Sequence, residues 1–179
     1  LRETRAFVGF SRLEPNQRTI SDRKKELRLG STEDWLPAIE VFGEGIFFKF
    51  DAEKLQKWAK IPSVQKRISK LNTAYHKARF GADSVGDLRP EYVLIHTFAH
   101  LIINQLSFDC GYGSSSIRER IYCERSSNDL NMYGLLIYTA SGDSEGSLGG
   151  LVRQGEAGRL EDTIVSAIEN ASWCTSDPI

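Results

Sequence analysis

The sequence predicts an α+β protein in which a mixed sheet packs with several amphipathic helices. Strand-like segments flank a helical middle section and do not alternate regularly with helices. The helical segment at about 90–107 is the most apolar one, whereas 132–140 has the short apolar run of a buried strand. A chain of 179 residues is long enough to bury a core of its own.

The first 50 residues are predicted to be rich in strands. The segment 4–13 alternates apolar and polar residues, as a half-buried strand does. A polar connection follows, and "WLPAIEVFGEGIFFKF" at 35–50 indicates two short strands around Gly43, Glu44 and Gly45. Glycines on both sides of a polar residue favour a turn, so these two strands are expected to pair as a β-hairpin.

Residues 51–107 are predicted to be helical. Asp51 is a suitable N-cap for a first helix, and Pro62 suits the first turn of a second helix that extends to about Phe80. Pro90 opens the third helix. The side chains expected to face inward follow the helical repeat: Leu55, Trp58, Val64, Ile68, Leu71 and Tyr75.

Residues 108–179 are predicted to mix strand, helix and loop. The segment Ile117–Cys123 suits either a short helix or a strand, and 132–140 is expected to be central in its sheet because it has no clear polar face. The small residues of "SGDSEGSLGGL" at 141–151 indicate a loop that either cradles phosphate with its N–H groups or makes a tight connection. Leu160–Trp173 has the pattern of a final amphipathic helix.

The whole chain, 1–179, is expected to be one α+β domain that forms the C-terminal portion of a longer protein. It would be strand-rich over 1–50, helical over 51–107 and mixed over 108–179. No apolar run reaches the roughly 18 residues of a membrane span. Three scattered cysteines are too few for a disulfide framework. These features predict a cytoplasmic protein without a membrane partner.

Charge is unevenly distributed along the chain, although its formal net charge is only −1. Residues 49–80 carry nine Lys and Arg against two acids, whereas 143–179 carry two Arg against seven acids. Such an asymmetry favours a nucleic-acid or acidic partner at the basic surface, and solvated helix faces are the alternative. The predicted nucleic-acid-binding residues are the basic side chains on the outer faces of the first two helices: Lys54, Lys57, Lys66, Arg67 and Lys70.

His96 and His100 are four residues apart in the apolar helix and would therefore share one face. Zinc-protease helices have this spacing with Glu beside the first His, where this chain has Thr97. A third ligand would have to be His76, an acid or a cysteine. We expect both histidines to be buried, hydrogen-bonded and free of metal.

A metal- or thiol-dependent hydrolase that uses His96, His100 and Cys110 is the enzymatic alternative. Cys110 follows the apolar helix, whereas the dipole that stabilises a thiolate is positive at a helix start. The sequence therefore predicts no catalytic residues, and convergence of these three side chains on an open pocket would contradict that prediction.

Three segments resemble the motif pattern of the MrfA-associated zinc-binding domain family: "HTFAHLIINQLSFDCGYGSSSIRERIY", "GLLIYTASGDSEGSLGGLVRQG" and "WCTSDP". That family occurs at the C-terminus of DNA-repair helicases and in DrmB, the partner of the DrmA helicase in the bacterial DISARM anti-phage system. "LRETRAFVGFSRL" and "WLPAIEVFGEGIFFKF" look more like the DrmB branch. The resemblance covers nearly the whole chain and is most specific over 91–178.

The resemblance implies a non-catalytic accessory module of a DNA helicase complex, which holds a DrmA-like helicase subunit and contacts DNA. The C-terminal domain of a superfamily 2 DNA-repair helicase is the alternative. The family's zinc cysteines lie around and after the "WCTSDP" stretch, so Cys174 carries over as a metal ligand if further cysteines follow it. The resemblance thus allows zinc in the full-length protein where those cysteines are present, and none is expected in this segment. The chain has no P-loop Lys and no Asp-Glu box, so ATP hydrolysis would belong elsewhere.

Overall fold

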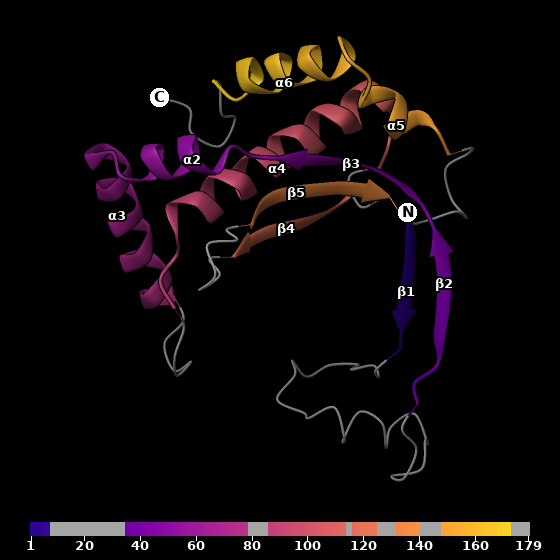
Figure 1. Ribbon diagram of the computed structural model, residues 1–179, viewed down its shortest axis with the longest axis horizontal. Coiled ribbons are helices and arrows are strands. Elements are labelled where there is room, and N and C mark those ends of the chain that lie inside the picture. Colours follow the sequence, from indigo (N-terminus) through magenta and orange to yellow (C-terminus); the bar gives the residue numbers. More distant parts are fainter. Residues whose placement is uncertain (8–34, 79–85, 114–115, 125–131, 140–147, 173–179) are drawn as a thin grey trace.

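The computed structural model describes residues 1–7, 35–78, 86–113, 116–124, 132–139 and 148–172. These residues form five strands and five helices, with one long helix lying across a three-stranded sheet and a two-stranded ribbon at the edge of the molecule (Figure 1). The predicted α+β class is confirmed, although the described strands form two antiparallel sheets in place of one mixed sheet. Among the helices described, none combines the length and apolar character needed to cross a membrane.

The three-stranded sheet consists of β3 (Glu44–Lys49), β5 (Met132–Thr139) and β4 (Arg118–Glu124), in the antiparallel order β3-β5-β4. The central position predicted for the 132–140 strand is thus confirmed. The segment that suited either helix or strand is strand β4, whose alternating residues point to opposite faces of the sheet.

The predicted hairpin between the strands at 35–50 is wrong. Strand β2 (Ala38–Phe42) pairs with β1 (Arg2–Ala6), whereas β3 pairs with β5. Gly43 alone separates β2 from β3, which leaves no room for a turn, and the chain passes directly from one sheet to the other (Figure 1). Gly45 also has a different role, because a Cβ there would lie 2.7 Å from the Ile137 carbonyl oxygen of β5. The part of the predicted 4–13 strand beyond Phe7 lies outside the described residues.

The predicted helices are present as α2 (Ala52–Ala59), α3 (Pro62–Ala78), α4 (Pro90–Cys110) and α6 (Arg159–Asn170), and a short helix α5 (Gly150–Gln154) precedes the last one. Asp51 caps α2, since its Oδ1 accepts a hydrogen bond from the Lys54 N–H at 2.9 Å. Helix α4 extends beyond its predicted end to Cys110. It stops at Gly111, whose φ of 71° provides the left-handed conformation of a helix C-terminus.

The core lies between α4 and one face of the three-stranded sheet. Helix α4 contributes a fully buried stripe with helical spacing: Ile95, Ala99, Ile102 and Leu106. Opposite this stripe, β5 contributes Leu135 and Ile137, which are also fully buried. Leu151 of α5 closes the end of the core near β3. The apolar stripe therefore fixes which side of α4 faces the sheet and which side remains accessible.

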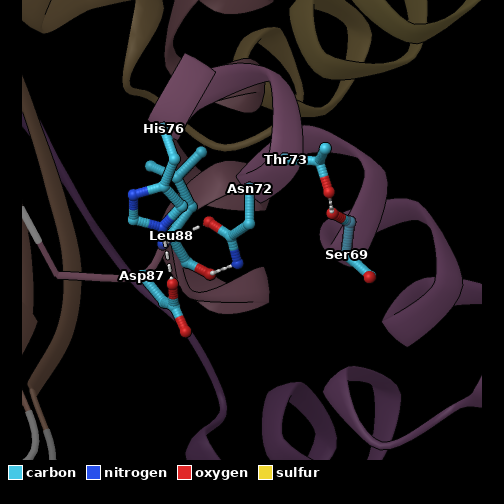
Figure 2. Close-up of polar contacts among 6 residues, drawn as sticks. All are labelled: Ser69, Asn72, Thr73, His76, Asp87 and Leu88. Atoms are coloured by element: carbon cyan, nitrogen blue, oxygen red, sulfur yellow. Dashed lines mark hydrogen bonds and ion pairs between the residues drawn. The ribbon is translucent and has the colours of Figure 1, made fainter. Parts of the chain in front are cut away.

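Two polar anchors hold α3 and β4 to the start of α4. The Asn72 side chain of α3 accepts a hydrogen bond from the Leu88 N–H at 2.7 Å and donates to the Leu88 carbonyl oxygen at 3.3 Å (Figure 2). His76 Nε2 lies 2.8 Å from Asp87 Oδ1 in the same cluster. The next residue, Arg89, donates from its guanidinium to the carbonyl oxygen of Cys123 at the end of β4. The connection before α4 thus positions one helix and one strand together.

Candidate functional site

His96 and His100 project from the side of α4 next to its buried stripe. Their side chains are 43% and 61% exposed, so the prediction that they are buried is wrong. The reason is their position in the helical repeat: each follows a fully buried residue, Ile95 or Ala99, and therefore lies at the edge of the stripe. There they face Glu119 of β4, a strand at the edge of the sheet.

The three side chains converge on one point. His96 Nε2 lies 3.0 Å from His100 Nε2 and 3.1 Å from Glu119 Oε1, and His100 Nε2 lies 3.9 Å from the same oxygen. The Glu119 side chain is only 23% exposed. Its Oε2 atom is buried, and no described residue makes a hydrogen bond to it. This group of imidazoles and carboxylate offers two nitrogen ligands and one oxygen ligand for a metal ion.

Sequence reasoning did not find Glu119. Of the third ligands considered, an acid is present but was not singled out as Glu119, and the other two lie elsewhere: His76 contacts Asp87, and Cys110 is ten residues beyond His100, or about 15 Å along the helix axis. The alternation of "RERIYC" does place Glu119 and Cys123 on one face of β4. The sequence offers no signal, however, that this face meets α4 beside the histidines.

The proposed thiol nucleophile is not part of this cluster. Cys110 is the last residue of α4 and is half-buried. Burial raises the pKa of the thiol, the Asp109 and Glu44 carboxylates raise it further, and a hydrogen bond from Gln154 opposes them. A raised pKa keeps the sulfur protonated at neutral pH, which opposes nucleophilic attack. Cys110 and the two histidines therefore do not converge on one site.

The segment 141–151 was expected either to cradle phosphate or to make a tight connection, and N–H groups in and next to its described part bind a carboxylate of the protein itself. Glu44 Oε2 accepts hydrogen bonds from the N–H groups of Gly149 at 2.8 Å and Val152 at 3.1 Å. Its Oε1 accepts from the Leu151 N–H and the Tyr112 hydroxyl, both at 3.1 Å. These described N–H groups are thus already used; 141–147 lie outside the described residues.

The hydrogen bonds to Glu44 determine its ionisation. Burial by itself raises the pKa of the carboxyl group, but the three backbone N–H groups and the Tyr112 hydroxyl outweigh burial and hold the pKa below its usual value of 4.5. Burial together with the adjacent Glu44 carboxylate raises the pKa of Tyr112 to about 12. Glu44 is therefore a buried anion that joins β3 to the start of α5.

The predicted nucleic-acid-binding residues lie on α2 and α3 and are together called the basic face: Lys54, Lys57, Lys66, Arg67 and Lys70. All five are exposed, whereas Leu55 and Ile68 on the opposite sides of these helices are buried. One of the two acids in the segment, Glu53, makes a loose pair of 3.8 Å with Lys57. In Figure 1, α2 and α3 occupy the end of the molecule away from the β1–β2 ribbon.

The face of the sheet opposite α4 carries a second group of side chains that sequence reasoning missed. Phe47 is 59% exposed and packs edge-to-face with Tyr122, with ring centres 5.9 Å apart. The guanidinium carbon of Arg120 lies 5.6 Å from the centre of the Tyr122 ring. Arg118 lies on the same face. Aromatic rings with arginines on an open sheet suit stacking of unpaired bases, and the alternation of "RERIYC" was the available signal.

Comparisons with known proteins agree with the family resemblance of the sequence. Residues 98–177 match the family model "MrfA Zn-binding domain", a range that includes His100 and Glu119. The chain is 43% identical over 185 aligned residues to "DISARM protein DrmB" from Bacillus paralicheniformis. That alignment covers 99% of this chain and 32% of the relative, so the chain spans about a third of the relative's length. Cys174 lies inside the matched range but outside the described residues.

Proposed function

We propose that this chain, a member of the MrfA Zn-binding domain family through residues 98–177, is a DrmB-like component of a DISARM anti-phage system. Its role there is to hold a DrmA-like helicase subunit and to contact DNA, with no bond broken by its own side chains. The proposal is supported by 43% identity to a DISARM protein over nearly the whole chain. Strand separation would then be carried out by the helicase subunit.

The observation that carries the DNA contact is the basic face. Its five cations are all exposed, while the apolar residues of the same two helices pack inward. Two hydrogen bonds between the Asn72 side chain and the Leu88 backbone hold α3 against the start of α4 (Figure 2). The basic side chains of α3 therefore lie on a fixed helix. Lys and Arg side chains on such a surface bind phosphates and release counterions, which makes affinity strongly dependent on salt. Phosphate contacts carry no base identity, so this face binds with little sequence preference.

The open sheet face suits a different form of DNA. Phe47 and Tyr122 present ring surfaces, and the adjacent arginines supply positive charge. Unpaired bases stack on such platforms, whereas bases within a duplex are not accessible to them. We therefore assign duplex phosphates to the basic face and strands separated by the helicase to the sheet face.

The test is a charge reversal on the basic face in the complete complex with the helicase subunit. We expect Lys66→Glu, Arg67→Glu and Lys70→Glu together to weaken duplex binding. Each lost phosphate contact should reduce the slope of log affinity against log salt by about 0.9. The matched control reverses three exposed arginines on other elements, Arg2, Arg153 and Arg159, and thus changes the net charge equally. If both variants bind like the parent, or if both weaken equally, the basic face makes no specific contact.

A further inference from the structure

We propose that His96, His100 and Glu119 form a binding site for a divalent transition metal, zinc in the first place. This site is distinct from the cysteine site that the family resemblance implies at Cys174, and it does not depend on the proposed role in DNA binding. It rests on the convergence of three ligand atoms from two elements and on the buried, unpartnered oxygen of Glu119.

The distances between the three ligand atoms are similar to those between the ligand atoms of a zinc ion. A tetrahedral zinc ion with bonds of about 2.0–2.1 Å holds its ligand atoms about 3.3 Å apart. The separations here are 3.0, 3.1 and 3.9 Å. The circle through the three atoms has a radius of about 2.0 Å, which equals a Zn–N or Zn–O bond length. An ion near the centre of this circle reaches all three atoms with little movement of the side chains.

Hydrogen bonds among His96, His100 and Glu119 do not satisfy all three of the atoms that face one another. An Nε2 atom either carries a proton and donates it or has a lone pair and accepts. If His96 donates to Glu119, it has no Nε2 lone pair for a proton from His100. If His96 instead accepts from His100, its lone pair faces the carboxylate oxygen at 3.1 Å. A cation that binds the lone pairs of all three atoms removes both unfavourable arrangements.

A cation would also stabilise the Glu119 carboxylate in its environment. The residue pairs with Ile137 of β5, on the face of the sheet that packs against α4. Among the described residues, its close basic neighbours are the two histidines, which are charged only if protonated. The adjacent Arg118 lies on the other face of the sheet and pairs with Glu3. A largely buried carboxylate with an unpartnered oxygen is costly unless a positive charge lies beside it. A divalent ion supplies that charge.

The ligand set favours zinc over magnesium or calcium, because imidazole nitrogens suit zinc and the hard cations prefer oxygen ligands. Two histidines and one glutamate leave a fourth position on the exposed side of the cluster. That position is available to water or to an oxygen or sulfur atom of another molecule. A bound ion would supply Lewis acidity there, and the three residues themselves would join α4 to the edge strand β4.

The experiment measures zinc content and melting temperature of the purified protein after removal of metal with a chelator and titration with zinc chloride. We expect one zinc per chain to be held by this cluster and to raise the melting temperature. His96→Gln and Glu119→Gln should each weaken this binding by at least about tenfold, since even loss of an outer partner of a metal ligand costs 10–100-fold. His76→Gln is the matched control, because His76 is an exposed histidine that contacts Asp87 elsewhere.

Cys174→Ser separates the two kinds of site. If the cluster binds zinc, this variant keeps the ion that His96→Gln loses. Cobalt provides a second readout, because its visible absorption reports whether nitrogen and oxygen or sulfur atoms surround it. The proposal is overturned if His96→Gln and Glu119→Gln retain all the zinc of the parent. It is also overturned if Cys174→Ser alone abolishes zinc binding and the stabilisation that accompanies it.

Discussion

Substitution of the buried Glu44 tests how β3 is joined to the start of α5. Its hydrogen-bond partners Gly149, Leu151 and Val152 follow it by more than 100 residues in the sequence. Glu44→Gln keeps the shape of the side chain and removes its charge. We expect this substitution to destabilise the protein, because an amide group offers one accepting oxygen where the carboxylate offers two.

The magnitude follows from the individual contacts. Whichever way the amide is oriented, its NH₂ group faces at least one backbone N–H, that of Leu151 or those of Gly149 and Val152. A buried donor left without a partner costs about 1–3 kcal/mol, and the surviving hydrogen bonds lose the contribution of the charge. The free energy of unfolding should therefore fall by about 2–4 kcal/mol at pH 7.

The pH dependence gives an independent signature of the charge. The pKa of Glu44 in the folded protein lies below its usual value of 4.5, so the folded state binds the proton less tightly than the unfolded state does. The stabilisation is therefore fully present above about pH 4.5 and is lost as the pH falls through the folded pKa. Since Glu44→Gln cannot titrate, the stability difference between parent and variant should be constant at neutral pH and shrink in acid.

Urea denaturation followed by circular dichroism at pH 7 and pH 3 measures both effects. Glu53→Gln is the matched control, because Glu53 is an exposed glutamate on α2 whose one ion pair is loose. Pairs of this kind contribute little, so the control should unfold like the parent at pH 7. The reasoning is refuted if Glu44→Gln matches the control at pH 7, or if its stability deficit is the same at pH 3.

Two further substitutions test the packing around the same elements. Ile137→Ala should destabilise by about 2–4 kcal/mol, because Ile137 is fully buried in the central strand and the change leaves a cavity; an unchanged urea midpoint would contradict this. Gly150→Ala should cost about 1–3 kcal/mol, because the new Cβ would lie 2.6 Å from the Tyr112 hydroxyl and must displace it from Glu44. If Gly150→Ala retains the parent's stability, the hydroxyl is not held where the structure places it.

The parts of the fold that the sequence predicts are those determined by local chemistry. The Asp51 cap, the prolines at the starts of α3 and α4, and the inward-facing Leu55 and Ile68 all depend on residues a few positions apart. The period of hydrophobic residues also identifies β5 as a buried strand. Its central position is confirmed by pairing with β3 on one side and β4 on the other, although only the face toward α4 is fully buried.

Two of the three failures involve partners that are distant in the sequence, and the third also involves a position in the helical repeat. The hairpin prediction treated β3 as the partner of β2, whereas its partner β5 begins at Met132, more than 80 residues later. Glu44 was considered only as a turn residue, and its partner Tyr112 is 68 residues away. The histidine pair was assigned to the core because its neighbours are apolar, but an edge position in the stripe and the nearby β4 place both rings on the surface. Periodicity identifies faces of elements and not the elements that those faces meet.

The contacts made by the connection Asp87–Arg89 do not depend on the side chains that the proposed variants change. Asn72 binds both backbone groups of Leu88, and Arg89 binds a backbone oxygen of β4. Contacts to main-chain atoms thus hold both α3, with its part of the basic face, and β4, which carries Glu119 of the proposed metal site. The side chains of Lys66, Arg67, Lys70 and His96 take no part in these contacts. Changes at these exposed side chains leave those contacts in place. A loss of DNA affinity or of zinc in such variants therefore reports the lost ligand contact, provided that the circular dichroism spectrum is that of the parent.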